Sequence, residues 1–153
     1  MKIEFLSHSV DETLRLAERF AKNLKRGDIV CLEGNLGAGK TTFVKGMASA
    51  LRVKPADVTS PTFIIMNYYK GKLPIYHFDF YRLENPKEIT TVNFDEYFYG
   101  DGISVVEWPE RLGESMPPEY FEIKLGHKGE SERLLHFSAR GENYLNRLIK
   151  IRI

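Results

Sequence analysis

The segment from Gly34 to Thr42 contains residues of the kind that bind phosphate groups. It matches the pattern G-x-x-x-x-G-K-[ST], with Gly34, Gly39, Lys40 and Thr41 at the fixed positions. Glycines allow the backbone to fold around an anion with successive N–H groups turned inward. Lys40 is expected to reach the β- and γ-phosphates as a point charge, and the Thr41 hydroxyl to bind Mg²⁺. The sequence therefore predicts a P-loop, whose other members are Asn35, Leu36, Gly37, Ala38 and Thr42.

The nucleotide expected on this loop is ATP with Mg²⁺. GTP-binding proteins usually carry an N-K-x-D signature after a later strand, and none occurs in the sequence. An apolar run at 29–33 precedes the loop and a helical pattern at 42–51 follows it, which is the context that the motif requires. A glycine-rich turn that matches by chance is therefore the weaker interpretation.

Two acids, Glu107 and Asp79, each follow a short apolar run that is typical of a buried strand. P-loop enzymes hold hydrated Mg²⁺ through an acid at the end of a neighbouring strand. Asp79 also lies between Phe78 and Phe80, where an acid is costly unless it has a partner. We therefore favour functional acids over two solvated strand ends. The expected metal ligands are Thr41, Glu107 and Asp79, and the expected catalytic residues are Lys40, Asp79 and Glu107.

A segment rich in hydroxyl groups follows the P-loop helix, at the place where switch loops often lie. Its residues Thr59, Ser60 and Thr62 could respond to the γ-phosphate and to the metal. A plain turn before a strand is an equally good interpretation of the same residues. The sequence alone leaves both open.

One histidine and three arginines near these motifs have less specific surroundings. His77 has no nearby partners with metal-ligand spacing, so we expect it to be structural or to hydrogen-bond an acid. Arg82, Arg111 and Arg133 are each candidates to neutralise phosphate charge, although a single arginine is more often a surface residue.

The elements that must position these residues follow from capping signals and periodicity. Ser9 and Glu12 match a capping box, which predicts a helix from there to about residue 24. Its apolar stripe consists of Val10, Leu14, Ala17, Ala21 and Leu24. Further helices are predicted at 42–51, 86–92 and 94–99, with a helix or tail at 143–151. An edge strand is predicted at 2–7, buried strands at 29–33 and 103–107, and hairpins at 62–69 with 73–80 and 119–125 with 133–139. This order predicts an α/β fold, a P-loop NTPase-like domain with a mixed central β-sheet flanked by helices.

Length and composition limit the remaining possibilities. The chain has 153 residues, of which 42% are hydrophobic, so we expect a single domain over residues 1–153 with one core. Cys31 is the only cysteine, which favours a reducing, intracellular setting without disulfides. We expect no signal peptide, no membrane segment and a cytoplasmic location, because no run approaches the roughly 20 apolar residues of a membrane helix. The net charge of +1 gives no footprint for strong autonomous binding to nucleic acid.

Four motifs together resemble one protein family. They are G-N-L-G-A-G-K-T-T at 34–42, S-P-T-F at 60–63, H-F-D-F-Y-R-L at 77–83 and V-E-W-P-E-R at 106–111. Their order and separation resemble the TsaE (YjeE) family, the ATPase of the bacterial machinery that makes threonylcarbamoyladenosine at position 37 of tRNAs reading ANN codons. The resemblance extends to about residue 140, and the tail after Gly141 has no counterpart in it.

The resemblance implies a small P-loop ATPase with slow hydrolysis that depends on partners. It implies work with the proteins TsaB and TsaD, and contact with tRNA only indirectly through that complex. It also implies roles for individual residues. Thr41 and Glu107 would bind Mg²⁺, Lys40 would hold phosphate, Asp79 would help the metal or the attacking water, Thr59 to Thr62 would sense the nucleotide, Trp108 and Arg133 would lie near the nucleotide, and Glu12 would approach the base.

Two other functions remain open from the residues alone. A small-molecule kinase could use the same P-loop, with Arg82 or Arg111 over the phosphate acceptor. A nucleotide-dependent interaction module could bind ATP with only incidental hydrolysis. The products formed from ATP separate the kinase from the ATPase, and a variant that binds ATP without hydrolysing it separates the module from both.

Overall fold

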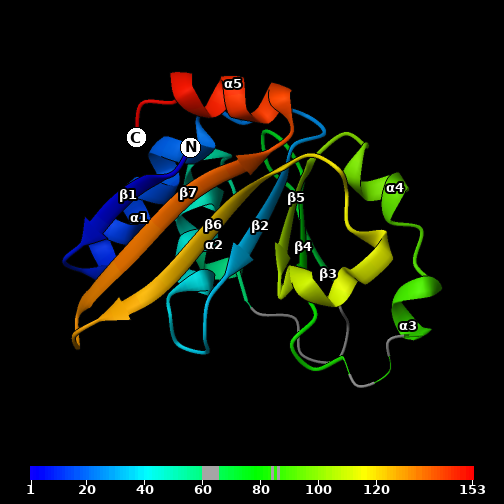
Figure 1. Ribbon diagram of the computed structural model, residues 1–153, viewed down its shortest axis with the longest axis horizontal. Helices are drawn as coiled ribbons and strands as arrows, with labels where there is room; N and C mark the ends of the chain where they lie inside the picture. Colours follow the sequence, from blue (N-terminus) through cyan, green and yellow to red (C-terminus); the bar gives the residue numbers. More distant parts are fainter. Residues whose placement is uncertain (60–65, 84, 86) are drawn as a thin grey trace.

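The computed structural model describes the whole chain except residues 60–65, 84 and 86 (Figure 1). Its strands are β1 (Ile3–Ser7), β2 (Ile29–Glu33), β3 (Met66–Tyr69), β4 (Ile75–Asp79), β5 (Ile103–Glu107), β6 (Tyr120–Lys128) and β7 (Glu132–Arg140). Its α-helices are α1 (Val10–Ala21), α2 (Lys40–Ala50), α3 (Lys87–Thr90), α4 (Phe94–Phe98) and α5 (Glu142–Lys150). Two 3₁₀ segments complete the described elements, η1 (Pro55–Asp57) and η2 (Pro109–Ser115). None of these helices has the length and hydrophobicity needed to cross a bilayer.

The strands form one mixed sheet in the order β1-β7-β6-β2-β5-β4-β3. At its centre β2 is parallel to β5 and to β6, and β4 is parallel to β5. The hairpin partners β7 and β3 are antiparallel to β6 and β4, and β1 forms one edge beside β7. The α/β fold with antiparallel hairpins around a parallel centre is thereby confirmed, as is the N-terminal edge strand.

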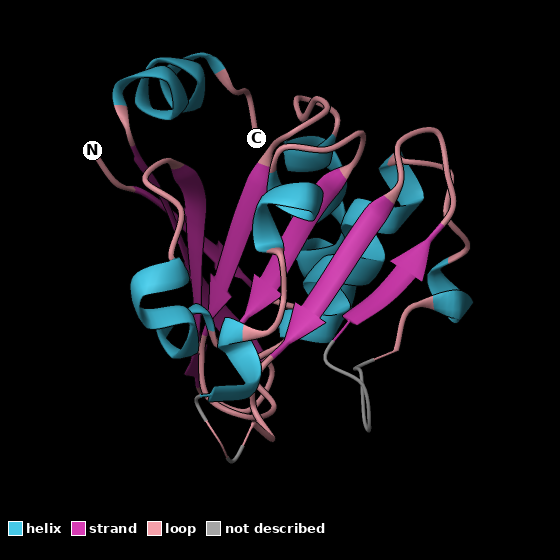
Figure 2. Cartoon of the chain, turned by 90° about the vertical axis from the view of Figure 1, so that its right-hand side faces the viewer, coloured by secondary structure: helices cyan, strands magenta, loops and turns pink. Residues whose placement is uncertain are grey.

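Apolar side chains cover both faces of the sheet, in two separate clusters. The larger cluster joins one face to α1, α2 and α5, and includes Phe20, Phe43 and Phe137. The smaller cluster joins the opposite face of β4 and β5 to α3, α4 and η2, and includes Phe78 and Phe94. Helices consequently lie on both sides of the twisted sheet (Figure 2). The central strands are buried from both sides, as parallel strands usually are.

Helix α1 begins as the capping box predicts, and Ala17, Ala21 and Leu24 of the predicted stripe are buried. The Ser9 hydroxyl accepts a hydrogen bond from the Glu12 amide, and the Glu12 carboxylate accepts one from the His8 amide. Val10, predicted in the apolar stripe, is 65% exposed, and Phe20 lies at the centre of the core instead. The stripe prediction was wrong only at its start, where Val10, the first residue of the helix, faces solvent. The helix ends at Ala21 rather than near residue 24.

Helix α2 begins at Lys40, two residues earlier than predicted. Its N-cap Gly39 has φ 106° and ψ 17°, a left-handed conformation that glycine adopts at little cost. Lys40 and Thr41 therefore belong to the first helical turn, next to the positive end of the helix dipole. This placement brings Lys40 and Thr41, the last two fixed residues of the P-loop motif, to the N-terminus of the helix.

The hairpin of β6 and β7 is longer than the predicted strands at 119–125 and 133–139. Its pairing continues to Lys128 opposite Glu132. The end of β6 is exposed and polar, so it lacks the apolar alternation that reveals a strand in sequence. The extension reaches the P-loop, since a Cβ atom at Gly37 would lie 3.9 Å from His127 Nε2.

The C-terminal residues form helix α5, one of the two alternatives expected for 143–151. Arg147 donates two hydrogen bonds of 2.6 Å to the two carboxylate oxygens of Asp28, a buried residue just before β2. The Tyr144 hydroxyl accepts a hydrogen bond of 3.1 Å from the Ile29 amide. Helix α5 therefore anchors the start of the strand that leads into the P-loop.

Arg147→Ala is expected to lower the free energy of unfolding by about 3 kcal/mol, because it leaves a buried carboxylate without its cation. Urea denaturation followed by circular dichroism measures the change. Arg26→Ala is the matched control, since the ion pair of Arg26 with Asp101 is exposed and should change stability far less. Equal losses in the two variants would show that the fold does not depend on the buried pair.

Candidate functional site

The P-loop connects the end of β2 to the start of α2, and its glycines are required for steric reasons. A Cβ atom at Gly34 would lie 2.5 Å from the Leu125 carbonyl oxygen, so any larger residue would push β6 away. Gly37 and Gly39 both have positive φ, which turns their peptide groups out of a helical path. Successive N–H groups in such a turn form a concave anion-binding surface.

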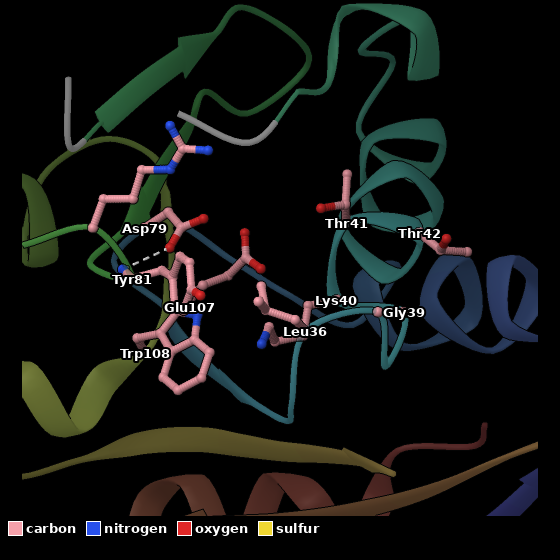
Figure 3. Close-up of a pocket in the computed structure, with 11 residues that line it drawn as sticks. Leu36, Gly39, Lys40, Thr41, Thr42, Asp79, Tyr81, Glu107 and Trp108 are labelled. Carbon is pink, nitrogen blue, oxygen red and sulfur yellow. Dashed lines mark hydrogen bonds between the residues drawn. The ribbon is translucent and has the colours of Figure 1, made fainter. Parts of the chain in front are cut away.

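Asp79 and Glu107 lie at the carboxyl ends of neighbouring parallel strands. The pairing of β4 with β5 places them directly opposite each other, and Glu107 also pairs with Leu32 of β2. Because side chains alternate along a strand, Asp79 and Glu107 point to the same face as Ile75 and Val105. That face carries α2, so both carboxylates point toward the first turn of the helix (Figure 3).

These groups meet in a cavity of about 630 Å³. Its walls come from the P-loop, the first turn of α2, the ends of β4 and β5, and the residues that follow those two strands. The lining residues are Leu36, Gly37, Gly39, Lys40, Thr41, Thr42, Asp79, Tyr81, Arg82, Glu107 and Trp108. Sequence reasoning is thus correct that the P-loop and both strand-end acids lie together. Gly34, Asn35 and Ala38 belong to the loop behind this surface and do not line it.

Lys40 is the buried cation of the cavity, with 6% of its surface exposed. Its ammonium group donates a hydrogen bond to the Gly34 carbonyl and lies 4.4 Å from the centre of the Trp108 ring. Burial lowers the pKa of Lys40, and the nearby carboxylates of Glu107 and Asp79 oppose that shift. The side chain therefore has a partly desolvated charge that an incoming anion would stabilise.

Trp108 forms a wall of the cavity beside Lys40, where the family resemblance expects it. Its backbone has φ 59° and ψ 50°, a left-handed conformation that is unusual for a bulky residue. The ring packs against Tyr81, with 5.1 Å between ring centres. Strain of this kind persists only where surrounding contacts fix the residue, and it is frequent at functional sites.

Asp79 is half-buried, and the pKa of its carboxyl group is raised above the ordinary value. Burial is the main cause, and the nearby Glu107 adds to it, while a hydrogen bond of 3.0 Å from the Tyr81 amide to Oδ1 opposes it. The two flanking phenylalanines, Phe78 and Phe80, belong to the apolar cluster on the other face. The partner that the sequence required for Asp79 is therefore a backbone amide.

Glu107 is buried, with 2% of its surface exposed, and its partner is His77. The distance from His77 Nε2 to Glu107 Oε2 is 2.6 Å. The other ring nitrogen, Nδ1, lies 3.1 Å from the Tyr69 hydroxyl. The expectation that His77 hydrogen-bonds an acid is confirmed.

The cavity offers oxygen ligands of the type that Mg²⁺ prefers. Thr41 lies across the cavity from Asp79 and Glu107, so one hydroxyl and two carboxylates face a common space (Figure 3). Among the described residues no group of three or more His, Cys, Asp or Glu side chains is gathered as a metal site. Magnesium in P-loop proteins needs no such group, since substrate phosphates and water complete its shell. The residues present therefore fit a Mg²⁺ ion bound together with a nucleotide.

Three other predicted site residues lie outside the cavity. The Arg133 guanidinium lies 3.5 Å from the Gly37 carbonyl, at the rim of the P-loop. The Glu12 carboxylate caps α1 and does not line the cavity. Thr59 contacts Tyr69 and lines a separate hollow beside β3. The remaining predicted switch residues, Ser60 and Thr62, lie outside the described residues.

Sequence reasoning did not assign Tyr81 to the site and left Arg82 undecided between phosphate and solvent. Both line the cavity, because the chain turns back over the strand end after Asp79. The available signal was the position of both residues directly after a strand-end acid. Arg111, the other arginine considered beside Arg82, donates to the Leu83 carbonyl at 2.7 Å instead.

Comparison with known proteins identifies the family. The family described as "Threonylcarbamoyl adenosine biosynthesis protein TsaE" matches residues 7–135. A Bacillus subtilis (strain 168) protein named tRNA threonylcarbamoyladenosine biosynthesis protein TsaE is 44% identical over 135 residues, which cover 88% of this chain and 84% of that protein. A protein of the same name from Aquifex aeolicus (strain VF5) is 47% identical over 112 residues, covering 71% and 77%.

A solved structure agrees with these relatives. The crystal structure of Bacillus subtilis YdiB matches with a TM-score of 0.83 and 36% sequence identity, over 99% of this chain and 94% of that chain. The P-loop and both strand-end acids lie within the span that the family matches. The resemblance inferred from the four sequence motifs is confirmed, and the chain belongs to the TsaE family.

Proposed function

We propose that this protein binds ATP with Mg²⁺ in the 630 Å³ cavity and hydrolyses it, as the ATP-driven component of tRNA threonylcarbamoyladenosine formation. One observation carries the proposal: the P-loop lysine and two strand-end carboxylates converge on a single cavity at a helix N-terminus. The names of the relatives support the tRNA modification, and the geometry supports the reaction on ATP.

Binding of the phosphates is assigned to Lys40 and the P-loop backbone. The N–H groups around Gly37 and Gly39 form a concave surface, and the first turn of α2 adds its positive end. Lys40 must leave the Gly34 carbonyl and the Trp108 ring to reach the β- and γ-phosphates. The negative charge of the phosphates then offsets the free-energy cost of desolvating the Lys40 ammonium group, the same desolvation that lowers its pKa.

Hydrolysis is assigned to the acids opposite the P-loop. Bound Mg²⁺ would supply positive charge to the phosphate oxygens, with Thr41 and Glu107 holding it. Asp79 Oδ1 accepts the Tyr81 amide, which leaves Oδ2 to accept a hydrogen from the attacking water. A raised pKa suits that task, because a carboxylate of higher pKa is a stronger base.

Partners are assigned from the family rather than from a surface of this chain. We propose that binding and release of the γ-phosphate change the affinity for TsaB and TsaD, which contact tRNA. The decisive test measures phosphate release from Mg-ATP by the pure protein, alone and with TsaB and TsaD, together with threonylcarbamoyladenosine formed on tRNA over several rounds. Release that rises with the partners, and modification that requires intact Lys40, support the proposal. Modification that proceeds equally without this chain overturns it.

Phosphoryl transfer to a small molecule is the competing reaction in the same cavity. Such kinases close arginines over the acceptor, and of the two candidates Arg111 is already bonded to the Leu83 carbonyl. Arg82 alone lines the cavity, which supports water as the acceptor. Phosphorus NMR of the products separates the reactions, because a kinase yields a phosphorylated metabolite in place of free phosphate.

Glu107→Gln is expected to lower the rate of phosphate release about 100-fold or more while ATP still binds, because the amide cannot replace a carboxylate at the metal. Intrinsic fluorescence reports binding, since Trp108 is the only tryptophan and lines the cavity. Glu110→Gln is the control, because Glu110 is close enough to act on Lys40 but does not line the cavity. Full turnover by Glu107→Gln would remove Glu107 from the mechanism.

Asp79→Asn is expected to stabilise the nucleotide-free protein at neutral pH while it slows hydrolysis. Folding raises the pKa of Asp79, so the neutral carboxyl is favoured in the folded state and ionisation lowers stability. The stability gain should be absent below the ordinary carboxyl pKa of about 4 and complete above the raised value. Thermal unfolding of both proteins from pH 3.5 to 8 measures it. A difference in melting temperature that is constant over this range would contradict the role of ionisation.

A further inference from the structure

Two side chains, Tyr69 and His77, link the backbone at Thr59 to Glu107 through contacts of hydrogen-bond length. The Tyr69 hydroxyl donates to the Thr59 carbonyl at 2.9 Å and accepts from the Thr59 amide at 3.2 Å. The same hydroxyl lies 3.1 Å from His77 Nδ1, and His77 Nε2 lies 2.6 Å from Glu107 Oε2. Tyr69 and His77 are buried, and neither lines the nucleotide cavity. The link therefore joins the segment after η1 to Glu107, an acid of the cavity, through residues that do not line the cavity.

The Tyr69 hydroxyl carries a single hydrogen, so its bond to His77 depends on the position of Thr59. His77 Nε2 faces a carboxylate, so it donates, and in a neutral ring Nδ1 is then an acceptor. The Tyr69 hydroxyl has one hydrogen and two acceptors within reach, the Thr59 carbonyl and His77 Nδ1. When Thr59 moves away, the hydrogen is available to His77 alone. The position of Thr59 thus decides how firmly Tyr69 holds the imidazole.

The imidazole in turn fixes the orientation of Glu107. A carboxylate rotates about one bond, and the bond at Oε2 prevents that rotation while Oε1 remains for the cavity. The residues two positions before His77 and Glu107 on their strands, Ile75 and Val105, point to the same face of the sheet and are apolar. A buried polar pair at this place is less favourable than apolar packing of similar volume, which argues for a role beyond stability.

We propose that Tyr69 and His77 are positioning residues that couple the position of Thr59 to the orientation of Glu107 during the ATP cycle. The inference rests on the proposed function of the cavity. Neither residue lines the cavity, and both act through Glu107. The Thr59 segment thereby influences the metal-binding acid without entering the cavity.

Two substitutions of His77 separate the two halves of the link. In His77→Gln the amide can donate to Glu107 from the place of Nε2 but does not reach Tyr69. In His77→Asn the amide reaches the Tyr69 side but not Glu107. Tyr69→Phe removes the central hydroxyl and keeps the ring, and Tyr68→Phe is the matched control on the same strand, since Tyr68 is exposed and lies outside the link.

The first measurement is the affinity for a non-hydrolysable ATP analogue, with Mg²⁺ and with EDTA, by Trp108 fluorescence. His77→Asn is expected to reduce the gain in affinity from Mg²⁺ about tenfold, the effect of losing one hydrogen bond to a charged group. His77→Gln and Tyr68→Phe are expected to stay within about twofold of the wild type. An unchanged Mg²⁺ gain in His77→Asn overturns the proposal.

The second measurement is steady-state phosphate release. Tyr69→Phe and His77→Gln are both expected to lower kcat about tenfold with KM for ATP changed less than about twofold. Both variants lose the contact between Tyr69 and residue 77, which leaves Glu107 less firmly oriented without affecting ground-state binding. A purely structural role would lower melting temperature and raise KM together, and that outcome overturns the proposal. If His77→Asn does not fold, Tyr69→Phe decides. Wild-type protein that releases no phosphate even with TsaB and TsaD present refutes the proposed function instead, so the two failures are distinguishable.

Discussion

The register between β4 and β5 is the constraint on which the candidate site depends. It places Asp79 opposite Glu107, and strand alternation then turns both carboxylates toward the first turn of α2. A slip of one residue would reverse every side chain and bury the acids among the phenylalanines of the opposite cluster. Apolar partners along the same strands, Ile75 opposite Ile103 among them, specify the register. Core packing and site chemistry are therefore fixed by one set of contacts.

Around this pairing the molecule tolerates several locally unfavourable features. Lys40 and Asp79 both have pKa values shifted by burial toward their neutral forms, and Trp108 has a left-handed backbone. Proteins depart from local rules mainly where function requires it, and these departures all border one cavity. The far end of β2, by contrast, is fully satisfied by the Arg147–Asp28 pair and by Tyr144. These three features lie at the carboxyl ends of β4 and β5 and at the P-loop, and the Arg147–Asp28 pair supports the opposite end of the sheet.

The parts of this arrangement that sequence predicted are those with local causes. The P-loop, the capping box at Ser9 and the acids that end two apolar runs all depend on residues within a few positions of one another. The longer β6–β7 hairpin was underestimated because its exposed end has no hydrophobic alternation. The contact of His77 with Glu107 joins residues 30 positions apart and depends on strand order, which no local pattern gives. Ser60 and Thr62 stay predictions.

The desolvated charges of the cavity have a consequence for the life of the protein in a cell. A ligand that supplies phosphate charge to Lys40 and a cation to the two carboxylates binds only the folded chain, so it raises the folded fraction by mass action. Proteases act on the unfolded fraction, which then falls as the ligand accumulates. The amount of this protein should accordingly rise with the concentration of the ligand that fills the cavity, even when its synthesis is constant.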